Sequence, residues 1–493
     1  MTAESVVPQI IQGGMGVAVS NWRLAATVSR LGQLGVVSGT ALEQVLARRL
    51  QDGDPGGHMR RALDRFPIPS MAERAWSAYY VAGGKSALAS YKTVPMHERY
   101  NSRELQELCI LANFAEVTLA REGHANDVGI NYLEKIQVPH LPSMYGAMLA
   151  GVGYILMGAG IPNRVPGALD RLARHEDAAY PLHVTGAVAG DDTTLTFSPR
   201  EFLPGELPPL RRPLFLAIVA SDVLALTLAR KSNGRVDGFV VEGPAAGGHN
   251  APPRGKLQLN RRGEPVYGER DEVDLKRLRD IGLPFWLAGG YGSADGLRAA
   301  LEHGAAGIQV GTAFAFCEES GIRDDYRREI LARVSDRSIQ VFTDPRASPA
   351  GFPFKVVRLR GTLADDRLFL MRPRICDLGY LREPYRMPDG AVGFRCPAEP
   401  TSVYVGKGGD FEDTIGRKCV CNALMANVGL GQVRAGRHVE QGLVTAGDDL
   451  AMGIQQFLED GRGTYSAADV IARILGGPSS DRGAASSAGP TDS

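Results

Sequence analysis

A single histidine stands where it could take part in proton transfer. His249 follows Gly247-Gly248, just after the strand-like run Gly238–Val241. Glycines there let a ligand approach the backbone closely, and imidazole titrates near neutral pH. A neutral His249 could remove an acidic proton from carbon, and its protonated form could stabilise an anionic oxygen. A loop histidine bonded to a backbone carbonyl is the alternative; the two glycines favour the catalytic role.

Glycine-rich turns follow several strand-like runs. The most informative are Gly289-Gly290, after Phe285–Ala288, and Gly311-Thr312, after Gly307–Val310. Their amides are open to an anion, and the threonine adds a hydroxyl donor. In a (β/α)8 barrel the loops after the last two strands often hold a phosphate, so these turns predict a phosphate-bearing ligand. The chain has neither a Walker A lysine pattern nor a Gly-x-Gly-x-x-Gly turn after a strand, which leaves ATP hydrolysis and a Rossmann site without support.

Strands that alternate with amphipathic helices must position these turns. The strand-like runs are Gln9–Gln12, Gly35–Ser38, Asp127–Leu133, Tyr154–Met157, Leu214–Val219, Gly238–Val241, Phe285–Ala288 and Gly307–Val310. Strands separated by helices favour parallel βαβ units, and eight of them predict an α/β fold, the TIM (β/α)8 barrel. A doubly wound sheet is the competing architecture. Ser20 is expected to cap the helix that covers Asn21–Arg30.

The barrel is expected to occupy residues 1–345, with two insertions. Residues 52–100 interrupt the rhythm and predict a helical insertion, while residues 177–212 predict a hairpin insertion. Residues 346–475 mix short strands, loops and helices, which predicts an α+β extension packed on the barrel. Residues 476–493 are rich in Gly, Ser, Ala and Pro and are expected to be disordered.

Composition limits the classes of function. Lys+Arg and Asp+Glu both number 55, so no basic excess exists to bind nucleic acid. The first residues lack the pattern of a secretory signal. Met144–Pro162 is uncharged over nearly the length of a membrane span, but its glycines favour a buried helix followed by a strand. We expect a cytoplasmic protein with no membrane span and no nucleic-acid partner, and take a homodimer as the working guess.

The six cysteines divide into two groups. Cys109 and Cys317 lie in helix-like contexts and are expected in the core. The other four fall in the extension: Cys376, Cys396, Cys419 and Cys421. Four thiolates could bind zinc or an iron–sulfur cluster, but this spacing matches no compact metal-binding pattern. We favour reduced, packed cysteines and no metal, with a metal site as the open alternative.

Five motifs, taken in order, resemble the nitronate monooxygenase family, formerly called 2-nitropropane dioxygenases. They are Gln12-Gly13-Gly14-Met15, Gly129-Ile130-Asn131, Glu242-Gly243-Pro244-Ala245-Ala246-Gly247-Gly248-His249, Ala288-Gly289-Gly290 and Gln309-Val310-Gly311-Thr312. FMN-dependent enoyl-acyl-carrier-protein reductases share this pattern, as do flavin reductases of polyketide and polyunsaturated fatty acid pathways. The resemblance runs through about residues 6–345, and its most specific element is the Ala-Gly-Gly-His stretch.

The resemblance implies a TIM barrel with a non-covalent FMN. The FMN phosphate is expected on Gly289-Gly290 and Gly311-Thr312. The expected contacts of the isoalloxazine ring are Gly14, Met15, Asn131 and Glu242, and the cofactor site also takes in Gly247, Gly248 and Ala288. Many relatives have Glu immediately before Ala-Gly-Gly-His, where this chain has Ala245. That departure bears on the substrate class rather than on the flavin.

The preferred function is nitronate monooxygenase, in which an alkyl nitronate reduces FMN, O2 reoxidises it, and a carbonyl compound and nitrite result. Two alternatives stay open: an NAD(P)H-dependent reductase of enoyl thioesters, and a flavin-binding accessory protein of a biosynthetic assembly. The substrate is accordingly a small molecule or an acyl thioester. The segment Asn250–Lys256 carries two prolines and two cations, and we interpret it as a lid over an anionic substrate, with a solvated loop as the alternative.

Overall fold

Eight parallel strands form one sheet that closes on itself. In the computed structural model, which describes residues 7–203, 205, 207–434, 438–458 and 461–476, the strand order is β1-β10-β9-β8-β7-β4-β3-β2. The two end strands meet, because the Gln12 amide donates to the Leu34 carbonyl at 2.9 Å and the Leu34 amide donates to the Ile10 carbonyl at 3.1 Å. A doubly wound sheet would stay open, so this closure confirms the predicted TIM barrel.

The barrel strands lie at the eight places that the sequence predicts. Their bounds are β1 (Ile10–Gln12), β2 (Gly35–Ser38), β3 (Val128–Leu133), β4 (Tyr154–Gly158), β7 (Leu214–Val219), β8 (Gly238–Glu242), β9 (Phe285–Ala288) and β10 (Gly307–Val310). They are mostly apolar because helices cover them outside and side chains fill the interior. Asn131, Glu242 and Gln309 are exceptions that line the cavity described below. The interior cluster includes Val36, Leu156 and Trp286, whose indole donates to the Pro8 carbonyl at 2.8 Å.

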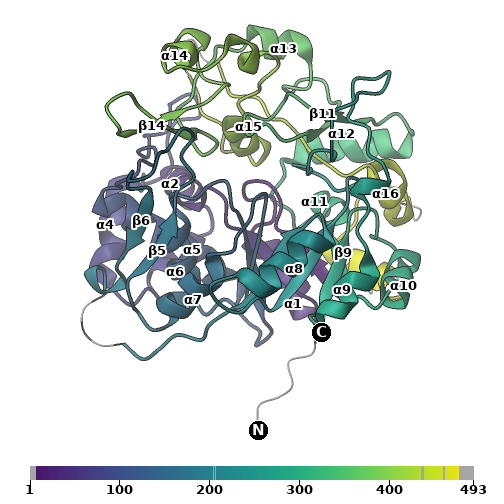
Figure 1. Cartoon of the computed structure of the whole chain (residues 1–493), viewed down its shortest axis with the longest axis horizontal. Helices are drawn as coiled ribbons and strands as arrows, with labels where there is room; N and C mark the ends of the chain where they lie inside the picture. Colours follow the sequence, from purple (N-terminus) through teal and green to yellow (C-terminus); the bar gives the residue numbers. More distant parts are fainter. Residues whose placement is uncertain (1–6, 204, 206, 435–437, 459–460, 477–493) are drawn as a thin grey trace, which may run out of the picture.

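Helices surround the barrel, and the helix that completes the ring comes from far along the chain. The ring consists of α1 (Trp22–Arg30), α5 (Arg103–Ala120), α6 (His140–Leu149), α7 (Val165–Ala173), α8 (Asp222–Lys231), α9 (Leu275–Ile281), α10 (Ala294–Glu302) and α17 (Ala467–Ile474). Helix α17 packs against both α1 and α10, which belong to opposite ends of the barrel sequence (Figure 1). The extension therefore supplies part of the barrel's outer layer.

A helical excursion separates β2 from α5. It contains α2 (Leu42–Gln51), α3 (His58–Leu63) and α4 (Pro69–Tyr79). Residues 80–102 then return to α5 without a helix or strand. This irregular stretch is tied to the fold by side chains, since Tyr91, Val94 and His97 are buried in it.

A second excursion follows α7. Strand β5 (Ala178–Pro181) pairs antiparallel with β6 (Thr194–Phe197), and η1 (Pro199–Glu201) follows. None of the described helices is long and apolar enough to cross a membrane. The uncharged stretch 144–162 instead contributes the end of α6 and the buried strand β4.

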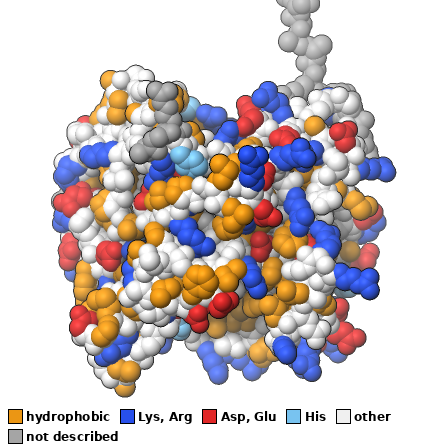
Figure 2. Space-filling model, turned by 90° about the horizontal axis from the view of Figure 1, so that it is seen from above, with side chains coloured by type: hydrophobic (Ala, Val, Ile, Leu, Met, Phe, Trp, Pro, Cys, Tyr) orange, Lys and Arg blue, Asp and Glu red, His pale blue; other side chains and the backbone are white. Residues whose placement is uncertain are grey.

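The extension forms a layer over the carboxyl ends of the strands (Figure 1). The barrel part also contains η2 (Glu269–Asp271), α11 (Thr312–Ala315), α12 (Asp324–Ser335) and β11 (Val341–Asp344), which pairs with β12 of the extension. The elements of the extension before α17 are β12 (Phe354–Val357), α13 (Asp366–Met371), β13 (Glu383–Arg386), β14 (Val392–Arg395), α14 (Thr401–Gly406), η3 (Phe411–Thr414), α15 (Val420–Asn427) and α16 (Leu450–Leu458). Viewed from above, its surface carries interspersed positive and negative side chains (Figure 2). Of the stretch predicted to be disordered, 477–493 lies outside the described residues.

Candidate active site

All twelve residues predicted for the site line one cavity, at the carboxyl ends of the barrel strands beneath the extension. They are Gly14, Met15, Asn131, Glu242, Gly247, Gly248, His249, Ala288, Gly289, Gly290, Gly311 and Thr312. The barrel brings them together because parallel strands deliver all their carboxyl-terminal loops to one face. The extension adds residues that the sequence analysis did not single out, among them Tyr380, Leu381, Thr445 and Asp449.

Ser20 fixes the loop after β1, although the sequence predicts it as the cap of α1. Asn21, not Ser20, caps α1, because its side chain accepts from the Leu24 amide at 3.0 Å. The prediction for Ser20 was therefore wrong. The Ser20 hydroxyl accepts from the Met15 amide at 2.9 Å and donates to the Gly13 carbonyl at 2.8 Å, so it holds the loop on which Gly14 and Met15 lie.

Asn131 and Gly14 are matched to each other. A Cβ on Gly14 would lie 2.4 Å from the Asn131 Cβ, so a larger residue does not fit there. The Asn131 amide nitrogen donates to the Gly14 carbonyl at 3.1 Å. Within the described chain, the buried Oδ1 of Asn131 and the buried Oε1 of Gln309 have no hydrogen-bond partner. Two unpaired amide oxygens in one cavity are suited to a ligand with N–H or O–H donors.

His249 is held by the hairpin of the extension. Its Nε2 is hydrogen-bonded to the Ser348 hydroxyl at 2.6 Å, and its ring packs edge-on against Phe354 with centroids 4.8 Å apart. Burial, and secondarily the nearby Lys135 ammonium, lowers the pKa of His249 to about 4. The imidazole is therefore neutral at neutral pH and able to accept a proton.

Lys135 approaches from the loop after β3. Its ammonium donates to the Ala350 carbonyl at 2.8 Å and lies 3.5 Å from the centroid of Phe352. Burial lowers the pKa of Lys135 to about 8. The residue thus braces the same 348–352 turn that holds His249, and its charge disfavours protonation of the imidazole.

Glu242, at the end of β8, lies where two cavities adjoin. Both Glu242 and His249 line the cavity described above and a second one, which is also lined by Arg254, Tyr267 and Phe352. Burial raises the pKa of Glu242 to about 7, so its carboxyl is partly protonated at neutral pH. A proton acceptor and a titrating acid therefore share the junction.

The predicted lid forms one wall of the second cavity. Asn250 is buried, and its amide donates to the Pro353 carbonyl at 2.9 Å, so the segment begins anchored to the extension. Arg254 lines the second cavity and donates to the Ala220 carbonyl at 3.2 Å. The segment thus borders the second cavity, and its role as a lid stays a prediction.

The predicted phosphate loops adjoin a half-buried acid, Asp449. Gly289 and Gly290 have φ of 84° and 87°, and a Cβ on Gly290 would meet nothing within 4 Å, so its backbone faces open space. The Thr312 hydroxyl accepts from the Gly447 amide at 3.0 Å and is hydrogen-bonded to Asp449. Burial raises the pKa of the Asp449 carboxyl. Sequence reasoning missed this acid because it lies more than a hundred residues beyond the loop that it contacts.

The stretch from Thr445 to Asp449 lies backbone to backbone against the His249 loop. The Gly248 amide donates to the Thr445 hydroxyl at 2.8 Å, and the Asp448 amide donates to the Ala245 carbonyl at 2.9 Å. A run of small and acidic residues between apolar stretches is the signal that could have marked this segment as a binding loop.

The four cysteines of the extension lie near one another but do not form a metal site by geometry. The thiols of Cys376 and Cys396 are hydrogen-bonded, and Cys421 lines the main cavity. Across the described part of the chain, the one group of three or more metal-ligand side chains with mutually close donor atoms lies elsewhere. A metal site on these four cysteines stays an untested alternative.

Comparison with known proteins matches one segment to a family whose description is nitronate monooxygenase. Residues 212–346 carry the nitronate monooxygenase pattern. This nitronate monooxygenase segment contains three of the five quoted motifs, so the resemblance is confirmed there. The fold places the other two motifs, which precede the segment, in the same cavity.

Curated proteins that are similar to part of this chain include nitronate monooxygenases and a carboxyl-CoA dehydrogenase. A nitronate monooxygenase of Pseudomonas aeruginosa is 37% identical over 117 residues, 24% of this chain and 32% of that protein. An octahydro-1H-indene-4-carboxyl-CoA dehydrogenase of Rhodococcus jostii is 36% identical over 142 residues, 28% of this chain and 34% of that protein. The matches thus span about a third of the length of these relatives.

Solved structures resemble the chain over most of its length. FabK from Thermotoga maritima is 17% identical with a TM-score of 0.47, covering 96% of this chain and 92% of that one. Nitroalkane oxidase from Streptomyces ansochromogenes is 14% identical with a TM-score of 0.45, covering 95% of each chain. Because both scores lie below 0.5, the fold assignment rests on the closed strand order.

Proposed function

We propose that this protein is an FMN-dependent oxidoreductase that oxidises alkyl nitronates with O2 to carbonyl compounds and nitrite. The observation that carries the proposal is the neutral, half-buried imidazole of His249 at the junction of two cavities, one of which is lined by the glycine loops. The nitronate monooxygenase segment, which contains His249, supports the same reaction class.

The main cavity fits FMN by the chemistry of its lining. The Gly289-Gly290 turn presents backbone without side chains, as a phosphate requires. The unpaired oxygens of Asn131 and Gln309 in the same cavity suit the N–H and hydroxyl donors of a flavin. When bound there, FMN supplies an electron acceptor for the substrate and a donor for O2.

His249 would accept a proton from the carbon beside the nitro group when the substrate arrives as a nitroalkane. When Nε2–H donates to Ser348, the other ring nitrogen, Nδ1, keeps its lone pair for the substrate proton. Lys135, which disfavours the imidazolium, would help the ring to release that proton again. A substrate that arrives as the nitronate skips this step and needs only to be oriented.

The second cavity is the proposed entrance for substrate. It meets the main cavity at Glu242 and His249 and is bordered by Arg254 and Tyr267. A guanidinium at the entrance favours an anionic substrate such as a nitronate. Closure of the Asn250–Lys256 segment over the substrate, as its sequence predicts, would exclude water from the site.

A second candidate is an oxidoreductase of acyl thioesters, such as an enoyl-thioester reductase. The extension contributes an apolar wall of Leu381, Val420 and Leu424 to the main cavity, which would suit an acyl chain. One curated relative of this chain is named for a carboxyl-CoA substrate. This candidate would take its electrons from NAD(P)H.

Anaerobic mixing of the FMN-loaded protein with propionate 3-nitronate, and with NADPH and NADH in parallel, tests the proposal. Flavin bleaching or a semiquinone with nitronate alone, followed by nitrite release in air, supports the nitronate monooxygenase. Bleaching with a nicotinamide alone would instead favour the thioester reductase and direct the search to enoyl thioesters. A protein that binds FMN but reacts with neither would favour an accessory role, and one that cannot bind FMN would overturn all three functions.

A further inference from the structure

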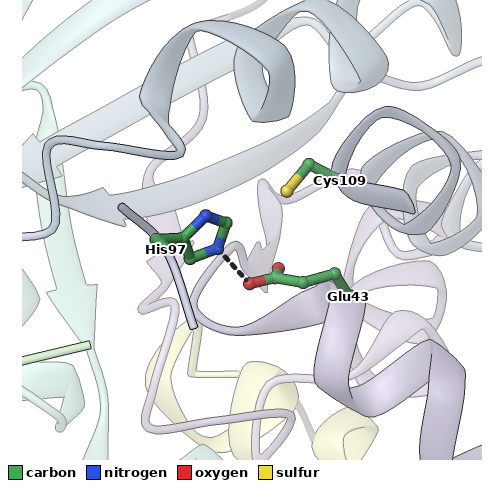
Figure 3. A group of neighbouring side chains, drawn as sticks. All are labelled: Glu43, His97 and Cys109. Atoms are coloured by element: carbon green, nitrogen blue, oxygen red, sulfur yellow. Dashed lines mark hydrogen bonds and ion pairs between the residues drawn. The ribbon is translucent and has the colours of Figure 1, made fainter. Parts of the chain in front are cut away.

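Glu43, His97 and Cys109 point toward one another in the interior, outside the cavity that lies over the strands (Figure 3). One carboxylate oxygen, one ring nitrogen and one sulfur all lie within 4.8 Å of one another. His97 Nε2 is 2.8 Å from Glu43 Oε1. The side chains come from three separate segments: α2, the irregular stretch 80–102, and α5.

The group is almost completely removed from solvent. The side chains of His97 and Glu43 are 7% and 3% exposed, and Cys109 is fully buried. Tyr380, from the extension, donates a hydrogen bond to Glu43, and its ring centroid lies 5.8 Å from that of His97. Among the described residues, the buried Nδ1 of His97 has no hydrogen-bond partner. Three different donor types thus converge at one buried point, where unpaired polar groups are costly.

We propose that Glu43, His97 and Cys109 supply three of the four ligands of a single Zn²⁺ ion, with a water molecule as the fourth. Oxygen, imidazole nitrogen and thiolate sulfur are the donors that zinc takes in proteins. A glutamate anion, a cysteine thiolate and Zn²⁺ sum to zero charge, which suits a buried site. Binding transfers the thiol proton of Cys109 to solvent, leaves His97 neutral with its proton on Nδ1, and replaces the hydrogen bond between His97 and Glu43 with two bonds to zinc.

The ion would fasten the irregular stretch 80–102 to the barrel. That stretch has no helix or strand, and His97 is its contribution to the group. Tyr380 would orient the Glu43 carboxylate from outside, as partners of metal ligands do. Because Tyr380 and Ala41, two residues before Glu43, also line the main cavity, zinc would stiffen one wall of that cavity.

Metal analysis of protein purified without chelator, and then dialysed against Zn²⁺, tests this proposal. We expect one zinc per chain, lost in Cys109→Ala and in Glu43→Gln. Cys317→Ala is the matched control, because Cys317 is equally buried but lies outside the group; it should keep the metal. Circular dichroism and bound flavin would show whether each variant is folded.

Substitution with Co²⁺ gives a readout specific to the sulfur ligand. The difference spectrum between the Co²⁺-loaded and Zn²⁺-loaded protein should contain a thiolate-to-cobalt charge-transfer band, absent in folded Cys109→Ala. A folded protein that takes up no metal after dialysis would overturn the proposal. Zinc retained in Cys109→Ala but lost in Cys421→Ser would overturn it as well, because the metal would then lie with the cysteines of the extension.

Discussion

His249 Nε2 and Ser348 Oγ are 2.6 Å apart, although 99 residues separate them in the chain. Ser348 is itself fully buried, and its hydroxyl accepts from the Ala350 amide at 3.2 Å. Arg417 donates to the Ser348 carbonyl at 2.6 Å, so the serine is held from the extension side as well. The orientation of the proposed base, His249, therefore depends on residues outside the barrel strands and their loops.

Removing this hydroxyl should impair turnover without removing the base. Partners that orient a functional histidine are worth about 10- to 100-fold in comparable sites. We expect Ser348→Ala to lower the rate of anaerobic flavin reduction by a nitroalkane by about tenfold, with flavin content unchanged. A fall with the neutral nitroalkane but not with the preformed nitronate would assign the serine to the proton-transfer step; equal rates in variant and parent would contradict this role.

His249→Gln removes the proton acceptor itself. Loss of a general base costs about 10²- to 10⁴-fold, so flavin reduction by a nitroalkane should fall by that factor. His303→Gln, at the end of α10 on the exposed side, is the matched control and should react like the parent. Stopped-flow absorbance under anaerobic conditions measures both, and a histidine that only packs would leave the rate within a few-fold of the parent.

The pH dependence follows from two opposite shifts. Burial lowers the pKa of His249 to about 4, so the proton-accepting form is present above that pH and is lost as the pH falls through it. Burial raises the pKa of Glu242 to about 7, so that carboxyl is protonated below pH 7 and charged above it. We expect the pH profile of kcat/KM for a nitroalkane to inflect near 7, and Glu242→Gln to abolish that inflection while keeping the acidic limb. An inflection near 7 that survives in Glu242→Gln would assign it to another group.

Asp449 should weaken the binding of a phosphate at the Gly289-Gly290 turn, because two negative charges repel across a buried site. Its carboxyl is hydrogen-bonded to Thr312, the hydroxyl residue predicted for the phosphate. We expect Asp449→Asn to tighten FMN binding by about tenfold, equivalent to about 1.4 kcal/mol, with a smaller gain at low pH where the parent carboxyl is protonated. Flavin fluorescence titration measures the change, and riboflavin, which lacks the phosphate, should show none. A gain with riboflavin as well would place the effect away from the phosphate.

Gly447 tests the backbone contact between the extension and the His249 loop. A Cβ there would lie 2.8 Å from the Ala245 carbonyl oxygen and 2.9 Å from Thr312 Oγ1. Overpacking of this kind costs about 1 to 3 kcal/mol, so Gly447→Ala should lower Tm and release FMN. Gly406→Ala is the control, because a Cβ on Gly406 meets nothing within 4 Å. Equal Tm values for the two variants would show that the Gly447 contact adjusts to the added Cβ without loss of stability.

The sequence predicts the barrel and most of its loops, because those signals are local. Apolar runs such as Leu214–Val219 and glycine turns such as Gly289-Gly290 can be recognised from their local pattern. A parallel barrel then brings the turns to one face. The sequence could not decide between Ser20 and Asn21 as the cap of α1, because both residue types cap helices well. The contacts of Ser20 with the loop after β1 leave the cap to Asn21. The partners of His249, such as Ser348, could not be predicted from the sequence, because no local pattern indicates a contact between residues 99 positions apart. The same holds for the convergence of Glu43, His97 and Cys109.

The position of α17 has a consequence for biosynthesis. Strand β1 pairs with β10 and α1 packs against α17, so residues near the beginning of the chain complete their contacts only when residues 467–474 have emerged from the ribosome. Until then, the apolar faces of α1 and α10 that α17 covers are open to solvent and to other nascent chains. The protein should therefore fold late, after translation of nearly all the described residues, and should depend on chaperones more than a barrel whose eighth helix directly follows its eighth strand.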